Sequence, residues 1–405
     1  MGETLQVPAP YPMRRAAGCP FDPPPDLARI QREAPVTRVR IWDGSTPWLV
    51  TRYADVRAVL ADPRVSAESD APGYPPVTVA FQERRRRSRN FVAMDDPEHA
   101  AQRRLLTADF MVKKMESLRP RIQQIVDELL DEMLAGPKPV DLVQAFALPV
   151  PSLVICTLLG VPYEQRNTFH RLSKVLVSRD ATAEEGIAAT EELLAFLEKV
   201  IEQKNADPGD DILSRLVVTQ LRTGAMTRRE IASLGQLLLV AGHETTANMI
   251  ALGTVALLQN PDQLAELRDT EDPKLVAGAV EELLRYLTIV HFGRRRTALE
   301  DIEIGGQLIR KGEGIIAATD VANRDRAAFD DPDALDIHRP ARHHITFGYG
   351  VHQCLGQPLA RVELQVAYPA LLRRIPTLRL AAPVEELPFK TDMLVYGVHE
   401  LPVTW

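Results

Sequence analysis

FGYGVHQCLG, residues Phe347 to Gly356, is the stretch that decides how this chain is interpreted. Two glycines, Gly348 and Gly350, make it prone to turns and allow its backbone to approach a flat ligand closely. Cys354 stands where a new helix is expected to begin, so its sulfur would lie among unpaired backbone N–H groups at the positive end of a helix dipole. The stretch therefore predicts a site for an anionic sulfur ligand.

The same ten residues resemble the haem-binding loop of the cytochrome P450 family. In that loop a Phe, two glycines, a basic residue, the Cys and a further Gly recur at fixed spacings. Here these positions are Phe347, Gly348, Gly350, His352, Cys354 and Gly356. The resemblance implies that the Cys354 thiolate is the axial ligand of a heme b iron. A buried structural cysteine is the alternative for a lone Cys, but an ungapped match of this length favours the haem ligand.

Length and composition favour one large domain. The 405 residues include no linker rich in Ser and Gly or in charge, and 45% of them are hydrophobic, enough for a large core. We expect residues 1–405 to form a single cytochrome P450 domain, in which the proline-rich residues 1–25 run extended over the surface. The formal net charge of −7 gives no basic field of the kind that binds nucleic acid, so a nucleic-acid partner is not expected.

The cysteines and one uncharged run bear on where the protein works. Only Cys19, Cys156 and Cys354 occur, with no secretory signal before them, which is typical of a reducing cytoplasm. Residues Leu142 to Tyr163 carry no charge and are numerous enough to span a bilayer, but two prolines interrupt them. A buried helix that starts at a proline explains this run better. We expect a cytoplasmic monomer without a membrane segment.

The spacing of apolar residues predicts a mainly α-helical chain with small β-sheets. Val36 to Ile41 and Pro47 to Thr51 alternate apolar and polar residues on either side of an Asp-Gly turn, which predicts a hairpin. Almost every segment from Pro97 to Asn260 fits a helix, and short strands are expected again at residues 302–309 and 314–318. Helix breaks are expected at Gly136-Pro137, Val161-Pro162, Asp207-Pro208-Gly209 and Thr223-Gly224.

One of these helices is expected to be central. It begins after Thr227, whose side chain can cap it while Glu230 reaches back, and it ends near Asn260-Pro261. About 33 residues at 1.5 Å each would extend roughly 50 Å, so this helix would cross the whole domain.

Polar residues interrupt the middle of that helix, in Ala241-Gly242-His243-Glu244-Thr245-Thr246. A structural explanation is that Thr245 bonds the carbonyl one turn back and bends the helix. The segment also resembles the oxygen-activating stretch of the P450 family, whose acid and alcohol match Glu244 and Thr245. The resemblance implies that Glu244 relays protons from solvent and that Thr245 donates a hydrogen bond during oxygen activation and holds a water. It also implies that Ala241 and Gly242 lie beside the haem, with Gly242 leaving room for a diatomic ligand.

Glu282 and Arg285 form a second constellation. Their spacing of three places them on one helix face, where an exposed pair would contribute little. The pair matches the Glu-x-x-Arg signature of the P450 family, and Arg339 fits the third member of that buried triad. The resemblance implies a structural role behind the haem for all three.

Four basic residues match positions that hold the haem carboxylates in the family. Asp96-Pro97 predicts a helix start, which puts His99 and Arg103 on the same helix face. Arg296, from a strand, and His352, from the Cys354 loop, match two further positions. Each of the four alone could be a solvated surface charge. Arg294 lies on the same strand face as Arg296, so the choice between these two arginines stays open.

Other basic and metal-binding patterns allow competing interpretations. His343, His344, His352 and Cys354 could surround zinc, but they include no pair of ligands at a short fixed spacing. His243 adjoins the acid and either faces the relay or packs inside the protein. The run of Arg84 to Arg87 with Arg89 fits a solvated mobile loop, or the border of a substrate entrance that favours an anionic substrate.

The resemblance covers nearly the whole chain and is nearest to soluble actinobacterial P450s of secondary metabolism and drug oxidation. It implies a monooxygenase that inserts one atom of O₂ into an apolar small molecule. Because no flavin-binding or iron–sulfur motif is present, electrons would come from a ferredoxin and its NAD(P)H-dependent reductase, docking on the Cys354 side. The candidate residues for the substrate pocket are Val92, Val177, Leu239, Val240, Ile289, Phe292 and Leu394.

Two classes of alternative remain beside the monooxygenase. A peroxide-driven oxygenase or nitric oxide reductase of the same fold would have less need of Glu244 and Thr245. A non-catalytic gas sensor or carrier would need neither. The presence of both residues favours turnover with O₂.

Overall fold

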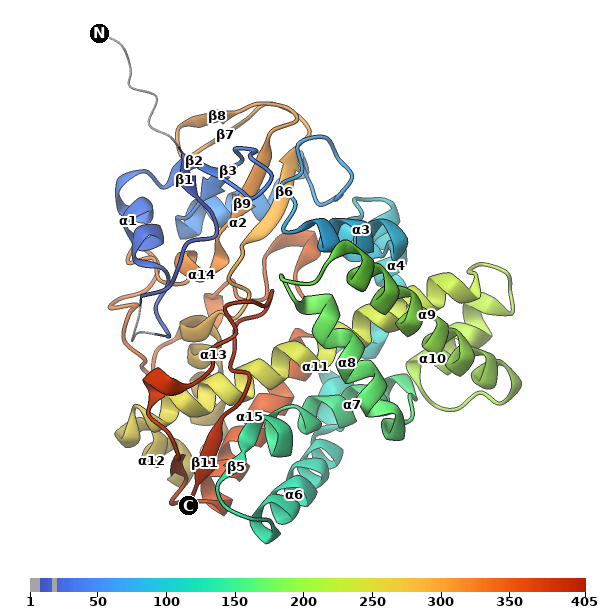
Figure 1. Ribbon diagram of the computed structural model, residues 1–405, viewed down its shortest axis with the longest axis vertical. Coiled ribbons are helices and arrows are strands. Elements are labelled where there is room, and N and C mark those ends of the chain that lie inside the picture. The colour runs from blue at the N-terminus through green and yellow to red at the C-terminus, as the bar shows by residue number, and fades with distance from the viewer. Residues whose placement is uncertain (1–7, 17–19) are drawn as a thin grey trace.

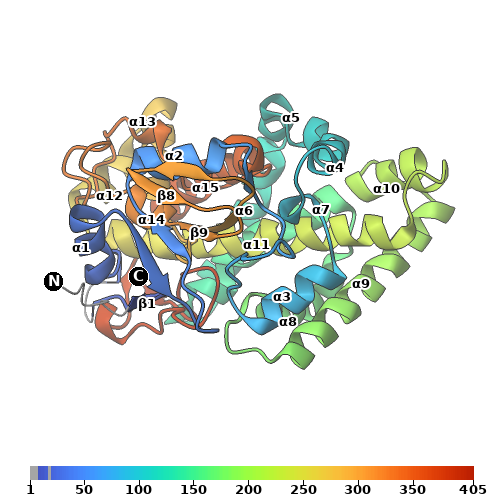
Figure 2. The ribbon, with the colours of Figure 1, turned by 90° about the horizontal axis from the view of Figure 1, so that it is seen from above.

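A long helix, α11 (Arg228–Leu258), crosses the molecule and the other elements pack around it (Figures 1 and 2). The structure is a computed structural model that describes residues 8–16 and 20–405, with every side chain in these ranges except those of residues 84–86. Helices α7 (Pro149–Leu159), α9 (Ala183–Ala206) and α15 (Gln357–Arg374) contact α11 most extensively. The prediction of a central helix is confirmed.

Helix α11 begins where the sequence places its cap. The Thr227 hydroxyl accepts the backbone N–H of Glu230, and the Glu230 carboxylate accepts the backbone N–H of Thr227, which completes a capping box. Most side chains along the helix are buried, so its surface has to be apolar nearly all round.

Helices make up most of the chain, and the predicted breaks near residues 136, 161, 207 and 223 separate them. The remaining α-helices are α1 (Pro25–Glu33), α2 (Tyr53–Ala61), α3 (Val79–Arg87), α4 (Glu98–Thr107), α5 (Val112–Ser117), α6 (Arg119–Ala135), α8 (Arg166–Val177), α10 (Ile212–Leu216), α12 (Pro261–Asp269), α13 (Pro273–Leu287) and α14 (Thr319–Ala322). Short π-helices cover Val143–Ala147 and Val217–Leu221. Two further breaks were not predicted: the chain is extended at Met111, just before α5, and it leaves helix between α8 and α9, where Ser178 bridges to Met393.

The uncharged run from Leu142 to Tyr163 folds as a π-helix followed by α7. Nearly all of α7 is buried, and it starts at Pro149, as the interpretation of a buried, proline-started helix predicts. Among the described residues, no helix is both long and apolar enough to cross a membrane.

A mixed sheet lies at one side of the helices (Figure 1). Within the described residues its strand order is β1 (Ala9–Pro10), β2 (Val36–Arg40), β3 (Trp48–Val50), β9 (Gly314–Ala317), β6 (Arg294–Ala298) and β4 (Val65–Ser66). Strands β2 and β3 pair antiparallel, which confirms the predicted hairpin. The strand expected at residues 302–309 is instead a second hairpin, β7 (Ile302–Ile304) with β8 (Gln307–Ile309), because Gly305 and Gly306 both have positive φ and turn the chain.

The two ends of the chain are tied to distant elements. Strand β1 pairs in parallel with β2, and Tyr11, which follows it, is buried. At the other end, β11 (Pro402–Thr404) joins β10 (Arg379–Leu380) and β5 (Val140–Asp141) in a small sheet. Part of the predicted extended segment 1–25 and Cys19 lie outside the described residues.

The basic run lies in a helix, and this corrects the expectation of a mobile loop. Residues 84–87 form the end of α3, which packs against α9, where Gly186 lies close to Ala80. Arg89, just after α3, pairs with Glu68 at 2.7 Å.

Candidate active site

The loop before α15 presents Cys354 at the N-terminus of that helix. Gly348 and Gly350 have φ of 76° and 73°, a conformation that glycine adopts without strain. A Cβ at Gly350 would run into the Leu60 carbonyl, so the loop also needs glycine for close packing. The backbone N–H of Cys354 donates to the Phe347 carbonyl at 2.8 Å, which closes the loop.

The Cys354 sulfur lies deep in the protein but is not enclosed by it. Burial raises the pKa of the Cys354 thiol, whereas the backbone N–H groups of Gly356 and Gln357 and the charges of Arg294 and Arg103 lower it. The side chain is nevertheless exposed, so the protein leaves room for a ligand at the sulfur. A desolvated thiol loses its proton most readily when a metal cation binds its sulfur and the proton is released to solvent, so this environment would suit a thiolate-bound iron.

The middle of α11 borders open space too. Ala241 is exposed and Thr245, one turn later, is partly exposed, although most of the surrounding helix is buried. The Thr245 hydroxyl donates to the Ala241 carbonyl at 2.8 Å, the local bond expected on structural grounds.

Contacts between α11 and α15 show how the Cys354 loop lies relative to the middle of α11. Tyr368 donates to the Met249 carbonyl, and earlier on α15 Glu363 reaches Thr246. Going toward the N-terminus of α15, from Tyr368 to Glu363, the contacts also move toward the N-terminus of α11, from Met249 to Thr246. The N-terminus of α15 therefore lies toward Ala241 and Thr245.

Gly242 faces the other way, which corrects the role expected for it. A Cβ at Gly242 would lie 2.9–3.0 Å from side-chain atoms of Ile155 on α7. Consecutive residues point about 100° apart around a helix, so the space saved by Gly242 lies against α7 and not beside Ala241. The glycine lets α7 pack closely against α11.

Glu244 is buried between two basic side chains. One of its oxygens lies 3.7 Å from His243 Nε2 and the other 3.9 Å from Lys390 Nζ. Burial lowers the pKa of His243, which hydrogen-bonds the Leu239 carbonyl at 2.6 Å through Nδ1. His243 is thus a packed helix histidine that also approaches the acid. Burial likewise lowers the pKa of Lys390, against the pull of Glu244.

The four predicted carboxylate-binding residues gather into one group, the cationic cluster of His99, Arg103, Arg296 and His352. The His99 and His352 ring centroids are 4.2 Å apart, and Arg103 donates to the Gln353 carbonyl at 2.6 Å. Burial, followed by the charges of Arg296, His99 and Arg103, lowers the pKa of His352 to about 3. His99 Nε2 is buried without a hydrogen-bond partner among the described residues. Crowded basic groups of this kind suit an anionic ligand such as the haem carboxylates.

Strand β6 presents Arg294 and Arg296 to the Cys354 loop. Arg294 donates to the Thr346 carbonyl at 3.2 Å, and the charge of Arg296 acts on His352. Arg295, between them, is buried on the opposite face, 5.4 Å from the centroid of the Tyr11 ring. Both arginines therefore adjoin the loop: the charge of Arg296 acts on His352, and the charge of Arg294 acts on Cys354.

Glu282, Arg285 and Arg339 form a connected network, here called the triad. Arg285 donates to both Glu282 oxygens at 2.7 and 2.8 Å, and Arg339 donates to Glu282 at 3.1 Å. Glu282 and Arg285 are fully buried, and Arg285 also donates to the carbonyls of Asn323 and Pro332. An exposed pair is therefore excluded.

The candidate substrate residues are only partly brought together. The Leu394 N–H donates to the Val177 carbonyl, and the Tyr396 N–H to the Ile289 carbonyl, which puts three candidates side by side. Val240 is partly buried and Val92 is exposed. Leu239 has no exposed surface and packs in the core instead, while Phe292 lines a different cavity, described below.

The histidines of the zinc alternative have other neighbours. His343 stacks on Phe329, and His344 Nε2 lies 3.2 Å from Glu281. His343 and His344 therefore do not join Cys354 in a common metal site.

Sequence reasoning missed two charged residues near the site. Glu363, on α15, is fully surrounded, and burial raises its pKa to about 8. A glutamate among Leu359, Val362 and Leu364 was a detectable signal, because a charge rarely occupies a buried helix face. Lys390 gave no comparable signal.

Comparisons with known proteins show which family the chain belongs to. The family model for cytochrome P450 matches residues 33–377. Cytochrome P450-SU2 of Streptomyces griseolus is 56% identical over 100% of this chain and 98% of its own. Pentalenic acid synthase of Streptomyces avermitilis is 48% identical over 100% and 99%. The crystal structure of GfsF, 54% identical, superposes with a TM-score of 0.92 over 98% of this chain and all of that one.

Such matches extend over the whole described fold, including the Cys354 loop and the middle of α11. The P450 family implies a haem iron bound by a cysteine thiolate, and the donor set around Cys354 fits that group. The chain belongs to the cytochrome P450 family and is a monooxygenase of that family.

Proposed function

We propose that Cys354 binds the iron of heme b and that the cationic cluster binds its carboxylates. The observation that carries this proposal is the Cys354 side chain, desolvated by the protein yet open toward Ala241 and Thr245. When bound, a haem iron with a thiolate ligand supplies the binding and splitting of O₂. Gly348, Gly350 and Gly356 shape the loop, Phe347 packs against Arg361, and the triad fixes the segment behind it.

Glu244 and Thr245 deliver protons to this site. The Glu244 carboxyl is held between His243 and Lys390, away from bulk water, and can pass a proton inward from the Lys390 side. Thr245 holds its proton at Oγ1 beside Ala241, where a rotation of the hydroxyl is enough to redirect it. The two residues thus divide the transfer between a buried acid and a hydroxyl at the open space.

The substrate is an apolar small molecule, a natural product or a xenobiotic, that is hydroxylated or epoxidised. Val177, Ile289 and Leu394, which adjoin one another, and Val240 on α11 supply an apolar wall. The name of the relative pentalenic acid synthase also indicates oxidation of a natural product.

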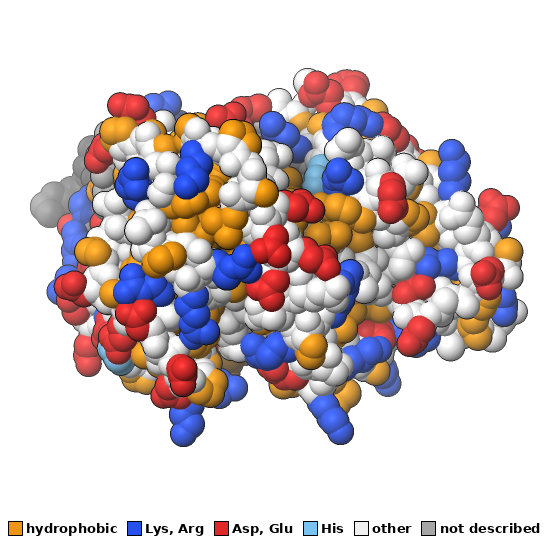
Figure 3. Space-filling model, turned by 90° about the horizontal axis from the view of Figure 1, so that it is seen from below, with side chains coloured by type: hydrophobic (Ala, Val, Ile, Leu, Met, Phe, Trp, Pro, Cys, Tyr) orange, Lys and Arg blue, Asp and Glu red, His pale blue; other side chains and the backbone are white. Residues whose placement is uncertain are grey.

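A ferredoxin and its NAD(P)H-dependent reductase supply the electrons. The surface on the Cys354 side carries a hollow whose lining includes Asp96, Arg103, Arg104 and the exposed Val351, and its two arginines suit an acidic partner. On the face shown in Figure 3, acidic and basic side chains are interspersed, which gives no broad basic field. We place this protein in the cytoplasm as a monomer, with residues 1–405 in one domain.

Carbon monoxide tests the ligand assignment. Reduced protein loaded with haem should give the red-shifted absorption band of a thiolate complex, and Cys354→His should lose that shift while it still binds haem. A normal thiolate band in Cys354→His would overturn the assignment of Cys354.

The proton-delivery assignment has its own test. With a compound that displaces the iron-bound water, Thr245→Ala should release hydrogen peroxide and make several-fold less product per NADPH, whereas Thr245→Ser should restore most of the coupling. Full coupling in Thr245→Ala would contradict this role.

A further inference from the structure

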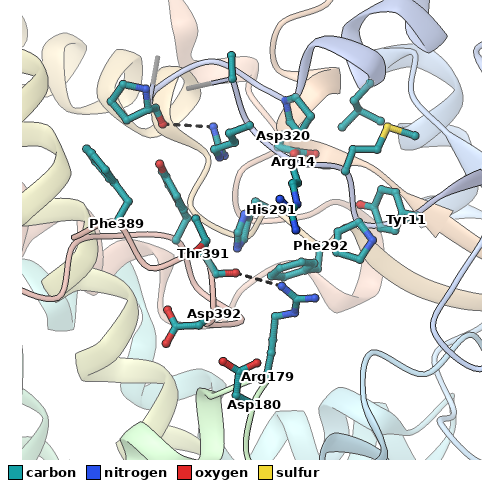
Figure 4. A pocket seen from close by; sticks show the side chains of 18 of the residues that line it. Tyr11, Arg14, Arg179, Asp180, His291, Phe292, Asp320, Phe389, Thr391 and Asp392 are labelled. Atoms are coloured by element: carbon teal, nitrogen blue, oxygen red, sulfur yellow. Dashed lines mark hydrogen bonds between the residues drawn. The ribbon is translucent and has the colours of Figure 1, made fainter. Parts of the chain in front are cut away.

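A second cavity lies between the N-terminal segment, the loop joining α8 to α9, and the C-terminal segment that follows α15 (Figure 4). Its volume is about 760 Å³, which is within the range of small-molecule sites, roughly 300–1,000 Å³. Its walls include Tyr11, Arg15, Arg179, His291, Phe292 and Asp320. None of the residues assigned to the haem lines it.

Strand β6 and the residues before it separate this cavity from the haem-facing side. Arg294 and Arg296 lie toward the Cys354 loop, whereas Arg295 lies on the other face near Tyr11. His291 and Phe292, just before the strand, face the second cavity.

The inner wall carries buried polar groups without partners. Tyr11 and Asp320 are each 4% exposed, and neither the Tyr11 hydroxyl nor either Asp320 carboxyl oxygen has a hydrogen-bond partner among the described residues. Arg15 Nε is also buried without one. Unsatisfied buried polar groups cost stability and are rare in folded proteins, so three of them around one cavity call for a ligand.

The charge of Asp320 is only partly compensated. Burial raises its pKa to about 6, and the charge of nearby Arg15 and the backbone N–H groups of Val321 and Asp320 oppose this shift. Arg15 itself lies over the Tyr396 ring at 4.1 Å and donates to the Pro20 carbonyl. The guanidinium is therefore held back from the carboxylate.

The chemistry of the walls selects the ligand. Cations and anions both line the cavity: Arg14, Arg15 and Arg179 against Asp180, Asp320, Glu385 and Asp392. A free cation or anion would meet a like charge there. A neutral hydroxyl group both accepts from Tyr11 or Arg15 and donates to Asp320, and it carries no charge to desolvate.

We propose that this cavity is a second binding site, which takes a neutral small molecule or group bearing several hydroxyls, such as a sugar or polyol. The hydroxylated group belongs either to the far end of the molecule being oxidised or to a separate molecule. The site stands on residues that the proposed catalytic function does not use.

The probe is methyl β-glucoside, and its binding to the haem-loaded full chain is measured by saturation-transfer NMR. Tyr11→Phe should weaken binding roughly 3- to 10-fold, because it removes a hydrogen bond to the ligand, and Asp320→Asn about 10-fold, because an amide oxygen accepts a weaker hydrogen bond than a carboxylate. Tetrahydropyran, the same ring without hydroxyls, should bind far more weakly. Tyr163→Phe and Asp269→Asn, matched changes away from the cavity, should leave binding unchanged.

Thermal unfolding separates binding from a structural role. If Asp320 serves a ligand, Asp320→Asn should keep or raise the melting temperature, because it removes an unpaired buried carboxylate. A lower melting temperature together with unchanged glucoside affinity would overturn the proposal. No saturable glucoside binding, or equal binding of tetrahydropyran, would overturn it too.

A haem-side inhibitor distinguishes the two sources. If saturating 4-phenylimidazole leaves glucoside binding intact, the site takes a separate molecule. If the inhibitor and the glucoside compete, the site receives the far end of the oxidised molecule.

Discussion

The triad and the cationic cluster both place charges inside this protein, and they differ in what completes them. Each charge of the triad is met by another residue: Glu282 is bonded by Arg285 and Arg339, and Arg285 by two carbonyls as well. In the cationic cluster basic groups crowd together and the buried His99 Nε2 has no partner among the described residues. Buried polar groups that the chain itself satisfies support the fold, and a buried polar atom that it leaves unsatisfied, such as His99 Nε2, marks where a ligand can bind.

The largest effect should come from breaking the triad. Glu282→Ala leaves Arg285 buried without its carboxylate, which should lower the free energy of unfolding by about 3–5 kcal/mol. Denaturant unfolding followed by circular dichroism measures this loss. Glu266→Ala, which breaks the exposed contact with His338, should cost less than about 1 kcal/mol. Similar losses in both variants would remove the distinction between the two kinds of pair.

The triad also shows what sequence can predict. Glu282 and Arg285 lie three apart on one helix, and the Thr227 cap of α11 depends on Glu230, so local spacing is enough for both. The loop glycines were predicted for the same reason.

Contacts between distant segments could not be predicted in this way. Lys390 reaches Glu244, and Tyr11 reaches the cavity wall near Asp320, only because the C-terminal segment and the N-terminal strand pack where they do. Gly242 was assigned to the wrong side because the direction in which a glycine faces depends on the rotation of its helix, and periodicity does not fix this rotation in a helix that is buried on nearly every side.

The carboxyl groups of Glu281 and Asp320 should make the stability of the protein depend on pH in opposite directions. Burial would raise the pKa of Glu281, but His344 and Arg361 bring it down to about 2, whereas the pKa of Asp320 rises to about 6. Glu281 therefore adds stability above its ordinary pKa of 4.5, and that stability is lost as pH falls toward 2. Asp320 acts in the opposite sense: because the folded state holds its proton more tightly, stability falls as pH rises from about 4 to 6.

Asp320→Asn should remove this fall in stability with rising pH. For a pKa raised from 3.8 to about 6, the fall amounts to roughly 3 kcal/mol of unfolding free energy. The measurement is the difference in unfolding free energy between the variant and the parent at several pH values from 4 to 7. Arg15 and Tyr11 interact with Asp320, and His291 lines the same cavity. Burial lowers the pKa of His291 from 6.5 to about 3, and the pH dependence that this causes is common to parent and variant, so it cancels in the difference. A difference independent of pH would contradict the raised pKa of Asp320.

The cationic cluster should respond to substitution in its ligand affinity and not in its fold. Arg103→Met keeps the length of the side chain and removes its charge, so haem should dissociate roughly 10-fold faster, the loss of one charge-assisted hydrogen bond. Transfer of haem to apomyoglobin measures this rate, and unfolding of the haem-free protein should change by less than about 1 kcal/mol. Arg104→Met, a neighbouring exposed arginine, should leave the rate unchanged; an equal acceleration would mean that general surface charge is responsible.

The smallest effect concerns Gly242, which the structure assigns to the packed side of α11. Gly242→Ala gains helix propensity but pushes a methyl group to within 2.9–3.0 Å of Ile155, so we expect a net loss of about 1 kcal/mol. Adding Ile155→Val frees space at that contact and should recover part of the loss, a coupling that a double-mutant cycle measures directly. Carbon monoxide binding to the reduced protein should be unchanged in Gly242→Ala. If carbon monoxide affinity falls and Ile155→Val does not restore stability, Gly242 borders the open space beside Ala241. The assignment of Gly242 to the contact with α7 would then be wrong.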